Sequence, residues 1–388
     1  SSCRQRVSEM GRGSVYDEIG VRRVINASGS MTYLGGSLIA PEVLAKMDEA
    51  AGAFVFIEEL LAWASGEIAS LTKTDAGLVT TGSAAGILLS TAACLTGNDR
   101  ERMRALPQTE SWKNEIVMQK QHRIGFDHAV GVAGGRIVEV GDAAGTSIDQ
   151  VKEALSDKTA AILHVVLDPT PTASLEEVAD VAHGHGIPVI VDAAAELPPV
   201  RNLSAFAEDG GDLVIFSGGK QVSGPNDSGI LCGRGDLVAA ATAQAFPNGG
   251  IGRPLKVSKE QIVGLVFALK RFASLDWDAQ VERWRQMAQR MAEILSAAAG
   301  VVETDVGFPQ GGGRPRIIPR TRVKIDEAMV GHTVMELDEI LEQGTPAIAV
   351  GAQASQQTIW LNPQHLEDGE DEIAARHLAD VLGRGASR

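Results

Sequence analysis

The sequence predicts an α/β fold with a mostly parallel sheet in a three-layer sandwich, followed by a small α+β C-terminal domain. Short apolar runs, typical of strands buried on both faces, alternate with helical stretches such as Ser147–Leu155 and Ser174–His185. This alternation indicates a parallel sheet covered by helices, whose last strand follows a short loop and is free to run antiparallel. The seven expected strands are Ala76–Thr81, Glu115–Gln119, Arg136–Val140, Ala160–Val166, Pro188–Asp192, Asp212–Phe216 and Gly229–Cys232.

The segments around this sheet predict three parts of the chain. Residues 1–50 form an N-terminal tail and arm that starts with the loose, polar stretch Ser1–Ser14, residues 51–270 form the large domain, and residues 271–388 form the small domain. Asp99–Asn114 is polar and is expected to be a loop. Helices are expected at Pro41–Glu49, Ile57–Leu71, Ile87–Leu95, Ile262–Leu275, Trp277–Ala299, His332–Glu342 and Glu370–Leu382, and small-domain strands at Thr321–Ile325, Ala347–Val350 and Thr358–Leu361.

Composition and charge are those of a globular enzyme. The chain has 388 residues, is 44% hydrophobic and carries a net charge of −15 without a run of Lys or Arg, which argues against a dedicated binder of nucleic acid or membranes. Cys3, Cys94 and Cys232 are widely spaced, so we expect neither a disulfide framework nor a metal site, and a reducing cytoplasm fits. No apolar run approaches the roughly 18 residues of a membrane-spanning helix, and no signal-peptide core is found.

Two of the expected strands are followed by ionisable residues. Asp192 ends the run Val189-Ile190-Val191, and Lys220 follows Leu213–Gly219. Ligands of open α/β sheets bind outside the carboxyl ends of the strands. A lysine and an acid at such ends suit pyridoxal 5′-phosphate (PLP), because the lysine forms a Schiff base and the acid keeps the pyridine nitrogen protonated. A single strand-end Asp or Lys is usually solvated, but the ordered pair with Ser-Gly-Gly before the lysine predicts a PLP site.

The segment Gly82-Ser83-Ala84-Ala85-Gly86 joins the first strand to an apolar helix. Free N–H groups and the helix dipole face one point at a helix N-terminus, and small side chains let an anion come close. A tight turn with Ser83 as the helix N-cap accounts for the same residues. Phosphate binding and simple capping therefore remain open alternatives.

Several motifs in a fixed order carry a resemblance to a known family. They are Asn26–Gly36, Leu106–Glu115, Gln119–Arg123, Val191–Pro198, Phe216–Lys220 and Gly252–Val257. With them the chain resembles the fold type I PLP enzymes, which have the aspartate-aminotransferase-like fold. More narrowly it resembles the selenocysteine-synthase-like group and, within it, the D-glucosaminate-6-phosphate ammonia-lyases. The resemblance covers nearly the whole chain after the tail.

This resemblance implies catalytic and cofactor-binding roles. Lys220 carries PLP and acts as acid and base at the substrate Cα, and Asp192 pairs with the pyridinium nitrogen. His122 stacks on the face of the cofactor, with a plain loop histidine as the alternative. The cofactor phosphate is held by the backbone of one turn and by one hydroxyl, contributed by Gly82, Ser83, Ala84 and Ser217.

Roles on the substrate side follow from the same resemblance. Asn26 and Thr32 line the entrance, and Arg123 meets either the substrate or a neighbouring acid. The loop Gly249–Arg253 reaches into the site of a partner subunit in a homodimer or higher homo-oligomer, where Gly252 contacts the cofactor and Arg253 lies near the substrate.

One departure from the family pattern concerns substrate binding. Fold type I enzymes usually hold the substrate α-carboxylate with a small-domain arginine, expected here after Pro346-Ala347-Ile348, but the next arginine is Arg376. The substrate then lacks a free α-carboxylate, carries it esterified or amidated, or has it bound by Arg253, Arg314 or Arg316. The glutamines of this segment, which either meet a neutral polar group or face solvent, are Gln353, Gln356 and Gln357.

The resemblance implies a cytoplasmic PLP-dependent lyase for a small amino-acid-like molecule. It acts at Cα and Cβ through an external aldimine and a carbanion, in a β-elimination of the ammonia-lyase type. The alternative is a racemase, transaminase or transferase for an unusual amino compound without a free α-carboxylate. Selenium transfer on a charged tRNA is disfavoured by the net charge of −15. A PLP-binding regulator is disfavoured by the intact Lys220 and Asp192.

Overall fold

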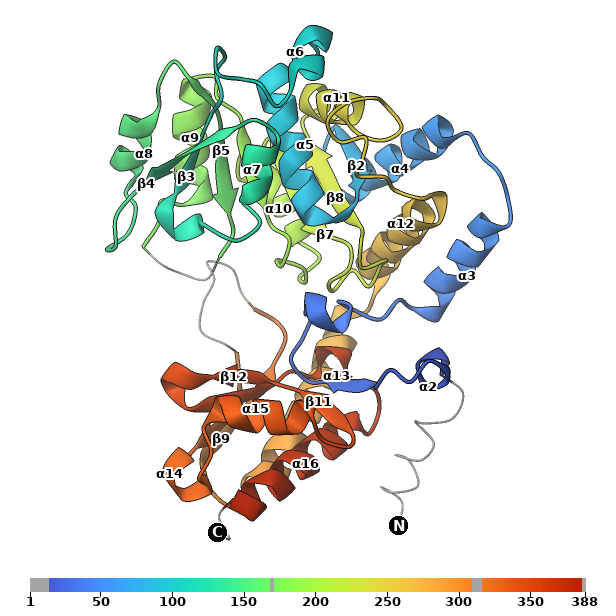
Figure 1. Ribbon diagram of the computed structural model, residues 1–388, viewed down its shortest axis with the longest axis vertical. Coiled ribbons are helices and arrows are strands. Elements are labelled where there is room, and N and C mark those ends of the chain that lie inside the picture. The colour runs from blue at the N-terminus through green and yellow to red at the C-terminus, as the bar shows by residue number, and fades with distance from the viewer. Residues whose placement is uncertain (1–13, 168–170, 309–315, 386–388) are drawn as a thin grey trace. The chain divides into compact units, whose positions relative to one another are not determined.

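The computed structural model describes residues 14–167, 171–308 and 316–385 (Figure 1). Most of the expected tail Ser1–Ser14, and Arg314 with the glycines before it, lie outside the described residues. The chain divides into two compact units. The large unit is Ser37–Leu275, and the small unit combines residues 14–36 with 276–308 and 316–385.

The large unit contains a seven-stranded sheet in the order β2-β8-β7-β6-β5-β3-β4. Strand β8 runs antiparallel to both of its neighbours, whereas all other pairs are parallel. The predicted α/β architecture with its antiparallel last strand is therefore confirmed. The strands are β2 (Ala76–Thr80), β3 (Glu115–Gln119), β4 (Arg136–Val140), β5 (Thr159–Val165), β6 (Val189–Asp192), β7 (Leu213–Ser217) and β8 (Gly229–Gly233).

Helices cover both faces of this sheet (Figure 1). Helix α5 (Gly82–Thr96) is buried on most of its sides and packs through Ile87 and Leu89 into the core of the sheet. The short helix α6 (Arg100–Ala105) replaces part of the expected loop, because the Asp99 carboxylate accepts hydrogen bonds from two backbone N–H groups of its first turn. The other helices are α3 (Pro41–Ala51), α4 (Ile57–Thr72), α7 (His128–Val132), α8 (Ile148–Ala154), α9 (Leu175–Gly184), α10 (Asn202–Glu208), α11 (Gly235–Gln244) and α12 (Lys259–Ser274), with the 3₁₀ turn η2 (Lys120–His122).

The small unit holds a four-stranded antiparallel sheet, in the order β12-β13-β10-β9, and a parallel pair of β1 and β11. Three of these strands, β1, β9 and β12, were not expected, because β1 and β12 have only three residues each and the polar residues of β9 give no apolar alternation. The strands are β1 (Val24–Asn26), β9 (Val301–Gly307), β10 (Arg320–Ile325), β11 (Ala347–Ala349), β12 (Gly351–Gln353) and β13 (Thr358–Leu361). The helices are α2 (Val15–Glu18), α13 (Trp277–Leu295), α14 (Glu327–Val330), α15 (Val334–Glu342) and α16 (Glu370–Gly385), with the turns η1 (Thr32–Leu34), η3 (Ala354–Gln356) and η4 (Pro363–His365).

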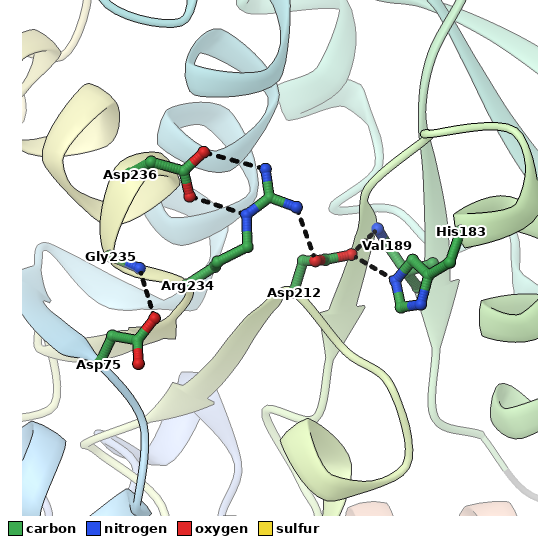
Figure 2. Close-up of polar contacts among 7 residues, drawn as sticks. All are labelled: Asp75, His183, Val189, Asp212, Arg234, Gly235 and Asp236. Carbon is green, nitrogen blue, oxygen red and sulfur yellow. Dashed lines mark hydrogen bonds and ion pairs between the residues drawn. The ribbon is translucent and has the colours of Figure 1, made fainter.

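Asp212, directly before β7, is the centre of a polar network at the amino ends of β6 and β7 (Figure 2). The Asp212 carboxylate accepts from the Val189 N–H, at 2.8 Å, and from the Arg234 guanidinium, at 3.0 Å. The same carboxylate lies 2.9 Å from His183 Nε2, and Arg234 also binds Asp236. This network joins the starts of neighbouring strands and leaves the opposite, carboxyl edge of the sheet for ligand binding.

No described helix combines the length and the apolar composition that crossing a membrane requires.

Candidate active site

Asp192 and Lys220 come together at the carboxyl edge of the large sheet. Asp192 is the last residue of β6 and pairs with Ile215 of the neighbouring parallel strand β7. Lys220 follows the end of β7 after a two-glycine turn, Gly218-Gly219. A side chain at Gly219 would collide with Asn226, so glycine lets the lysine-bearing turn pack closely against the segment before β8.

The two groups perturb each other electrostatically. Burial raises the pKa of Asp192, and the Ala194 N–H and the Lys220 cation partly offset this. Burial lowers the pKa of the Lys220 amine, while Asp192 and Glu196 act in the opposite direction. A buried amine with a lowered pKa reaches its neutral, proton-accepting form more readily than an exposed lysine.

The amino end of α5 lies at the same edge of the sheet. Gly82 has a φ of +78°, which favours glycine, and no side chain caps this helix. The Ser83 N-cap alternative is therefore wrong, since Thr81 occupies that position without a capping bond. Glycine at position 229 lets β8 approach this turn, because a side chain there would lie 2.5 Å from the Gly82 carbonyl carbon. The first N–H groups of α5 are left without helical partners, as an anion site requires.

His122 ends the turn η2 after β3 and is only 3% exposed. Its ring makes an edge-to-face contact with His164 of β5, with 4.5 Å between the ring centroids. Burial lowers the pKa of His122 to about 4 and that of His164 to about 3, so both rings are neutral at pH 7. The Nδ1 atoms of both rings are buried and have no hydrogen-bond partner. His164 was missed at the sequence level, although a lone histidine inside the apolar run Ala160–Val166 was the available signal.

The Arg123 guanidinium is held by acids of its own unit. Its Nε donates to the Asp127 carboxylate at 2.6 Å, and one Nη donates to Glu139 at 2.9 Å. Of the two roles predicted for Arg123, the structure gives it the pairing with a neighbouring acid.

The predicted entrance residues Asn26 and Thr32 lie in the small unit. The Asn26 carboxamide is occupied locally, since its oxygen accepts from the Ser28 and Gly29 N–H groups and its nitrogen donates to the Gly29 carbonyl. Thr32 starts the turn η1 and is exposed. Asn26 therefore shapes the loop that follows β1, and Thr32 is free to meet a ligand.

The loop Gly249–Arg253 belongs to the large unit. A side chain at Gly252 would lie 2.5 Å from Leu89 of α5, so this glycine permits close packing within the subunit. Arg253 is exposed, with its guanidinium 5.1 Å from the centre of the Phe246 ring.

Ser217, the hydroxyl predicted to help hold the phosphate, is the last residue of β7. It pairs with Gly229 of β8 and lies three residues before Lys220.

Three glutamines, and no arginine, lie in the segment after β11 where the family pattern predicts the carboxylate-binding arginine. The Gln353 carboxamide oxygen accepts from the Trp360 indole N–H at 3.3 Å, and Gln357 donates to Glu327 at 3.1 Å. Gln356 is exposed. Two of the three glutamines thus have partners within the small unit, and the third faces solvent.

These residues fit the requirements of PLP. The large unit provides a half-buried lysine, a buried acid, an uncapped helix N-terminus for the phosphate, and a neutral imidazole with an unpartnered nitrogen. When bound, PLP supplies an electron sink for negative charge that develops at the substrate Cα.

Comparison with known proteins agrees with this geometry. A family model described as L-seryl-tRNA selenium transferase matches residues 24–340. The chain belongs to this family. It is 33% identical to a 5'-C-glycyluridine monooxygenase-decarboxylase of a Streptomyces species, over 95% of this chain and 92% of that protein. It is also 33% identical to the D-glucosaminate-6-phosphate ammonia lyase of Salmonella typhimurium, over 96% of this chain and 99% of that protein.

Solved structures place the family in the predicted fold type. A structure of D-glucosaminate-6-phosphate ammonia-lyase matches with a TM-score of 0.83 and 32% identity, covering 97% of this chain and all of that one. An N-succinyldiaminopimelate aminotransferase of Mycobacterium tuberculosis, at 16% identity and a TM-score of 0.53, shares the fold alone. The predictions of a selenocysteine-synthase-like, fold type I enzyme that uses PLP are confirmed by these matches. The chain is a PLP-dependent enzyme.

Proposed function

We propose that this enzyme is a PLP-dependent lyase that acts at Cα and Cβ of an amino-acid-like substrate and releases ammonia. The observation that carries the proposal is the pair of the buried Asp192, at the end of β6, and the half-buried Lys220, just beyond the end of the neighbouring strand β7. The similarity to an ammonia lyase over nearly the full length supports the same class of reaction.

Each large-unit residue has a defined task in this proposal. The Lys220 Nζ takes the proton from the substrate Cα, and its desolvated setting favours the neutral amine that this step needs. Asp192 holds a proton at the ring nitrogen of the cofactor. The turn Gly82-Ser83-Ala84 and the Ser217 hydroxyl hold the phosphate, and the neutral His122 ring covers the cofactor face.

The overall reaction balances without an external oxidant. The Cα–H bond breaks, a hydroxyl or similar group leaves Cβ with its electron pair, and hydrolysis of the resulting enamine gives a keto product and ammonia. The test is a substrate screen of the PLP-loaded enzyme that follows ammonia and keto product together. Equal amounts of both, without oxygen uptake and absent in Lys220→Ala, support the lyase. No ammonia from any compound of the screen, including amide, ester and decarboxylated analogues of amino acids and amino sugar acids, contradicts it.

A second candidate is an oxidative decarboxylase, favoured by the equal identity to the Streptomyces monooxygenase-decarboxylase. An oxygen electrode separates the two functions, since only the second consumes oxygen and releases carbon dioxide. Racemases, transaminases and transferases use the same first proton transfer, but they would neither release ammonia together with a keto product nor consume oxygen.

The substrate is predicted to differ from simple free amino acids. A bidentate pair between an arginine and the substrate carboxylate contributes about 1.5–3 kcal/mol, or roughly 10- to 150-fold in binding. The segment after β11 contains no arginine that could form this pair. We therefore expect poor turnover of D-glucosaminate-6-phosphate and of simple free amino acids. A kcat/KM for the sugar acid above about 10⁴ M⁻¹s⁻¹, a common value for enzymes, would contradict this.

The same proposal includes assembly and location. The large unit, proposed as the PLP-binding domain over residues 51–270, exposes a run of aromatic and aliphatic side chains before α4, in which Phe54 is 103% and Phe56 is 77% exposed. A second copy of the chain would bury such a patch. The enzyme is thus a homodimer or higher oligomer in which Arg253 reaches the neighbouring site.

The cysteines support the proposed location. Cys94 and Cys232 are free thiols, which suits the reducing cytoplasm.

A further inference from the structure

Two side chains of the small unit, Ser30 and His365, form a close pair that the proposed lyase reaction does not use. Ser30 lies in the loop between β1 and η1, and His365 is the last residue of η4. The Ser30 Oγ is 2.6 Å from the His365 Nε2. The two segments are joined beside this pair, because the Asn362 N–H donates to the Ala27 carbonyl at 2.7 Å. The pair therefore lies within one compact unit.

A neighbouring carboxamide, that of Gln364, determines where the protons of this pair lie. The Asn362 Oδ1 accepts from the Gln364 backbone N–H at 3.0 Å, so the Asn362 Nδ2 is the atom that donates to the Gln364 Oε1, also at 3.0 Å. The NH₂ group of Gln364 then faces the pair. It donates to the Ser30 Oγ at 2.9 Å and lies 2.9 Å from the His365 Nε2.

This arrangement selects one tautomer of His365. A carboxamide N–H beside a ring nitrogen requires that nitrogen to be an acceptor, so the proton of the neutral ring is on Nδ1. The Ser30 O–H then donates to the His365 Nε2, as the hydroxyl of a catalytic serine donates to its general base.

The surroundings keep this base unprotonated and within reach of solvent. Burial lowers the pKa of His365 to about 4, so its ring is neutral at pH 7. The side chains of Ser30, Gln364 and His365 are only half-buried, as a group that meets a substrate from solution must be. A structural link between the two segments needs no imidazole, because the backbone bond between Asn362 and Ala27 already provides one.

We propose that Ser30 is a nucleophile activated by His365, and that the small unit hydrolyses small carboxylic esters in a reaction separate from the PLP chemistry. The Ser30 Oγ attacks the ester carbonyl carbon, and its proton passes to the His365 Nε2. The bond to the alcohol breaks, and the alcohol leaves with that proton. Water then attacks the acyl-serine with the help of the same base and releases the acid. One ester and one water thus give one acid and one alcohol.

Gln364 has a second role in this reaction. Its NH₂ group, beside the Ser30 Oγ, supplies a hydrogen-bond donor for the negative charge that develops on the carbonyl oxygen during the attack. The Asn362 side chain holds this donor in place through the Gln364 Oε1.

The test identifies the reactive residue directly. The borohydride-reduced holoenzyme, whose cofactor site is blocked, is incubated with a fluorophosphonate, which forms an Oγ–P bond and releases fluoride. Peptide mapping by mass spectrometry should find the adduct on Ser30. Ser28 of the same loop is the matched control, because its hydroxyl donates to the Asn26 Oδ1 at 3.0 Å instead of to an imidazole. An unlabelled Ser30, or equal labelling of Ser28, overturns the proposal.

The rate of labelling tests the role of His365. Labelling should be at least about a hundredfold slower in His365→Gln, within the range for general-base catalysis, and should change less than about twofold in Ser28→Ala. From pH 8 to pH 5 the wild-type rate should fall less than about twofold, because a base with a pKa of about 4 stays unprotonated, whereas an ordinary imidazole at about 6.5 would lose about thirtyfold. A thirtyfold loss, or an unchanged rate in His365→Gln, contradicts the assigned base. The mapped adduct and the pH profile use the wild type, so they decide the matter even where a variant fails to fold.

Ester turnover tests the activity itself. The borohydride-reduced enzyme, which has no lyase activity, should hydrolyse p-nitrophenyl acetate, and Ser30→Ala should lose at least about 90% of this activity while Ser28→Ala retains it. Equal hydrolysis in the wild type and Ser30→Ala, or a labelled Ser30 without hydrolysis of the ester, overturns the esterase.

Discussion

Replacing His164 by phenylalanine should reduce the loss of stability that the enzyme shows between pH 7 and pH 5. His122 and His164 are buried neighbours whose pKa values lie at about 4 and about 3 in the folded protein. In the unfolded chain an imidazole has a pKa of about 6.5. Between these values the unfolded chain binds more protons than the folded one, so the free energy of unfolding falls as the pH falls.

The size of this loss of stability follows from the difference between the folded and unfolded pKa values of each histidine. Each histidine removes on the order of 2 kcal/mol from the free energy of unfolding between pH 7 and pH 5, or about 4 kcal/mol for the pair. Phenylalanine preserves an edge-to-face ring contact with His122 and does not titrate. The loss in His164→Phe should therefore be about 2 kcal/mol smaller than in the wild type.

The assay is urea unfolding at both pH values, followed by circular dichroism, after borohydride has attached the cofactor covalently. His128→Phe at an exposed position of α7 is the control and should lose as much stability as the wild type. Equal losses in wild type and His164→Phe would refute the conclusion that the buried pair is neutral in the folded enzyme.

Three further predictions concern the cofactor site and the assembly. Gly229→Ala should weaken PLP binding in equilibrium dialysis by at least about tenfold, because its methyl group would strike the Gly82 backbone, whereas Gly131→Ala, with open space around it, should bind PLP normally. Asp192→Asn should retain PLP but lose most turnover, and activity within about twofold of wild type would count against its role. Sedimentation should give a dimer or larger, with dissociation in Phe56→Asp; a fully active monomer would disprove shared sites.

Much of the large sheet was predictable because its signals are local. Buried parallel strands are continuous apolar runs, so β3 was predicted to the residue. The edge strand β4, in which only Val140 is buried, was also predicted to the residue. Helix α6 was missed because its signal is a single capping residue, Asp99, within a polar stretch. Strand β9 was missed because its acids look like a loop until β10 provides cations to pair with them.

The candidate site also contains features that local sequence predicts and features that depend on pairing between strands. Asp192 and Lys220 could be predicted because parallel strands bring their carboxyl ends to one edge of the sheet. The contact between His122 and His164 depends on the order of β3 and β5, and the pairing of Arg322 with Asp305 depends on the register between β9 and β10. Register between strands is a non-local property, and the sequence pattern of one strand alone does not specify it.

The most direct test of the PLP assignment is to find the lysine that carries the cofactor. The purified enzyme is loaded with PLP, reduced with borohydride and digested, and the labelled peptide is sequenced by mass spectrometry. The label should lie on Lys220, the half-buried amine near Asp192, and should be absent from Lys220→Ala. A label on another lysine, or an equally labelled Lys220→Ala, would contradict the proposed site.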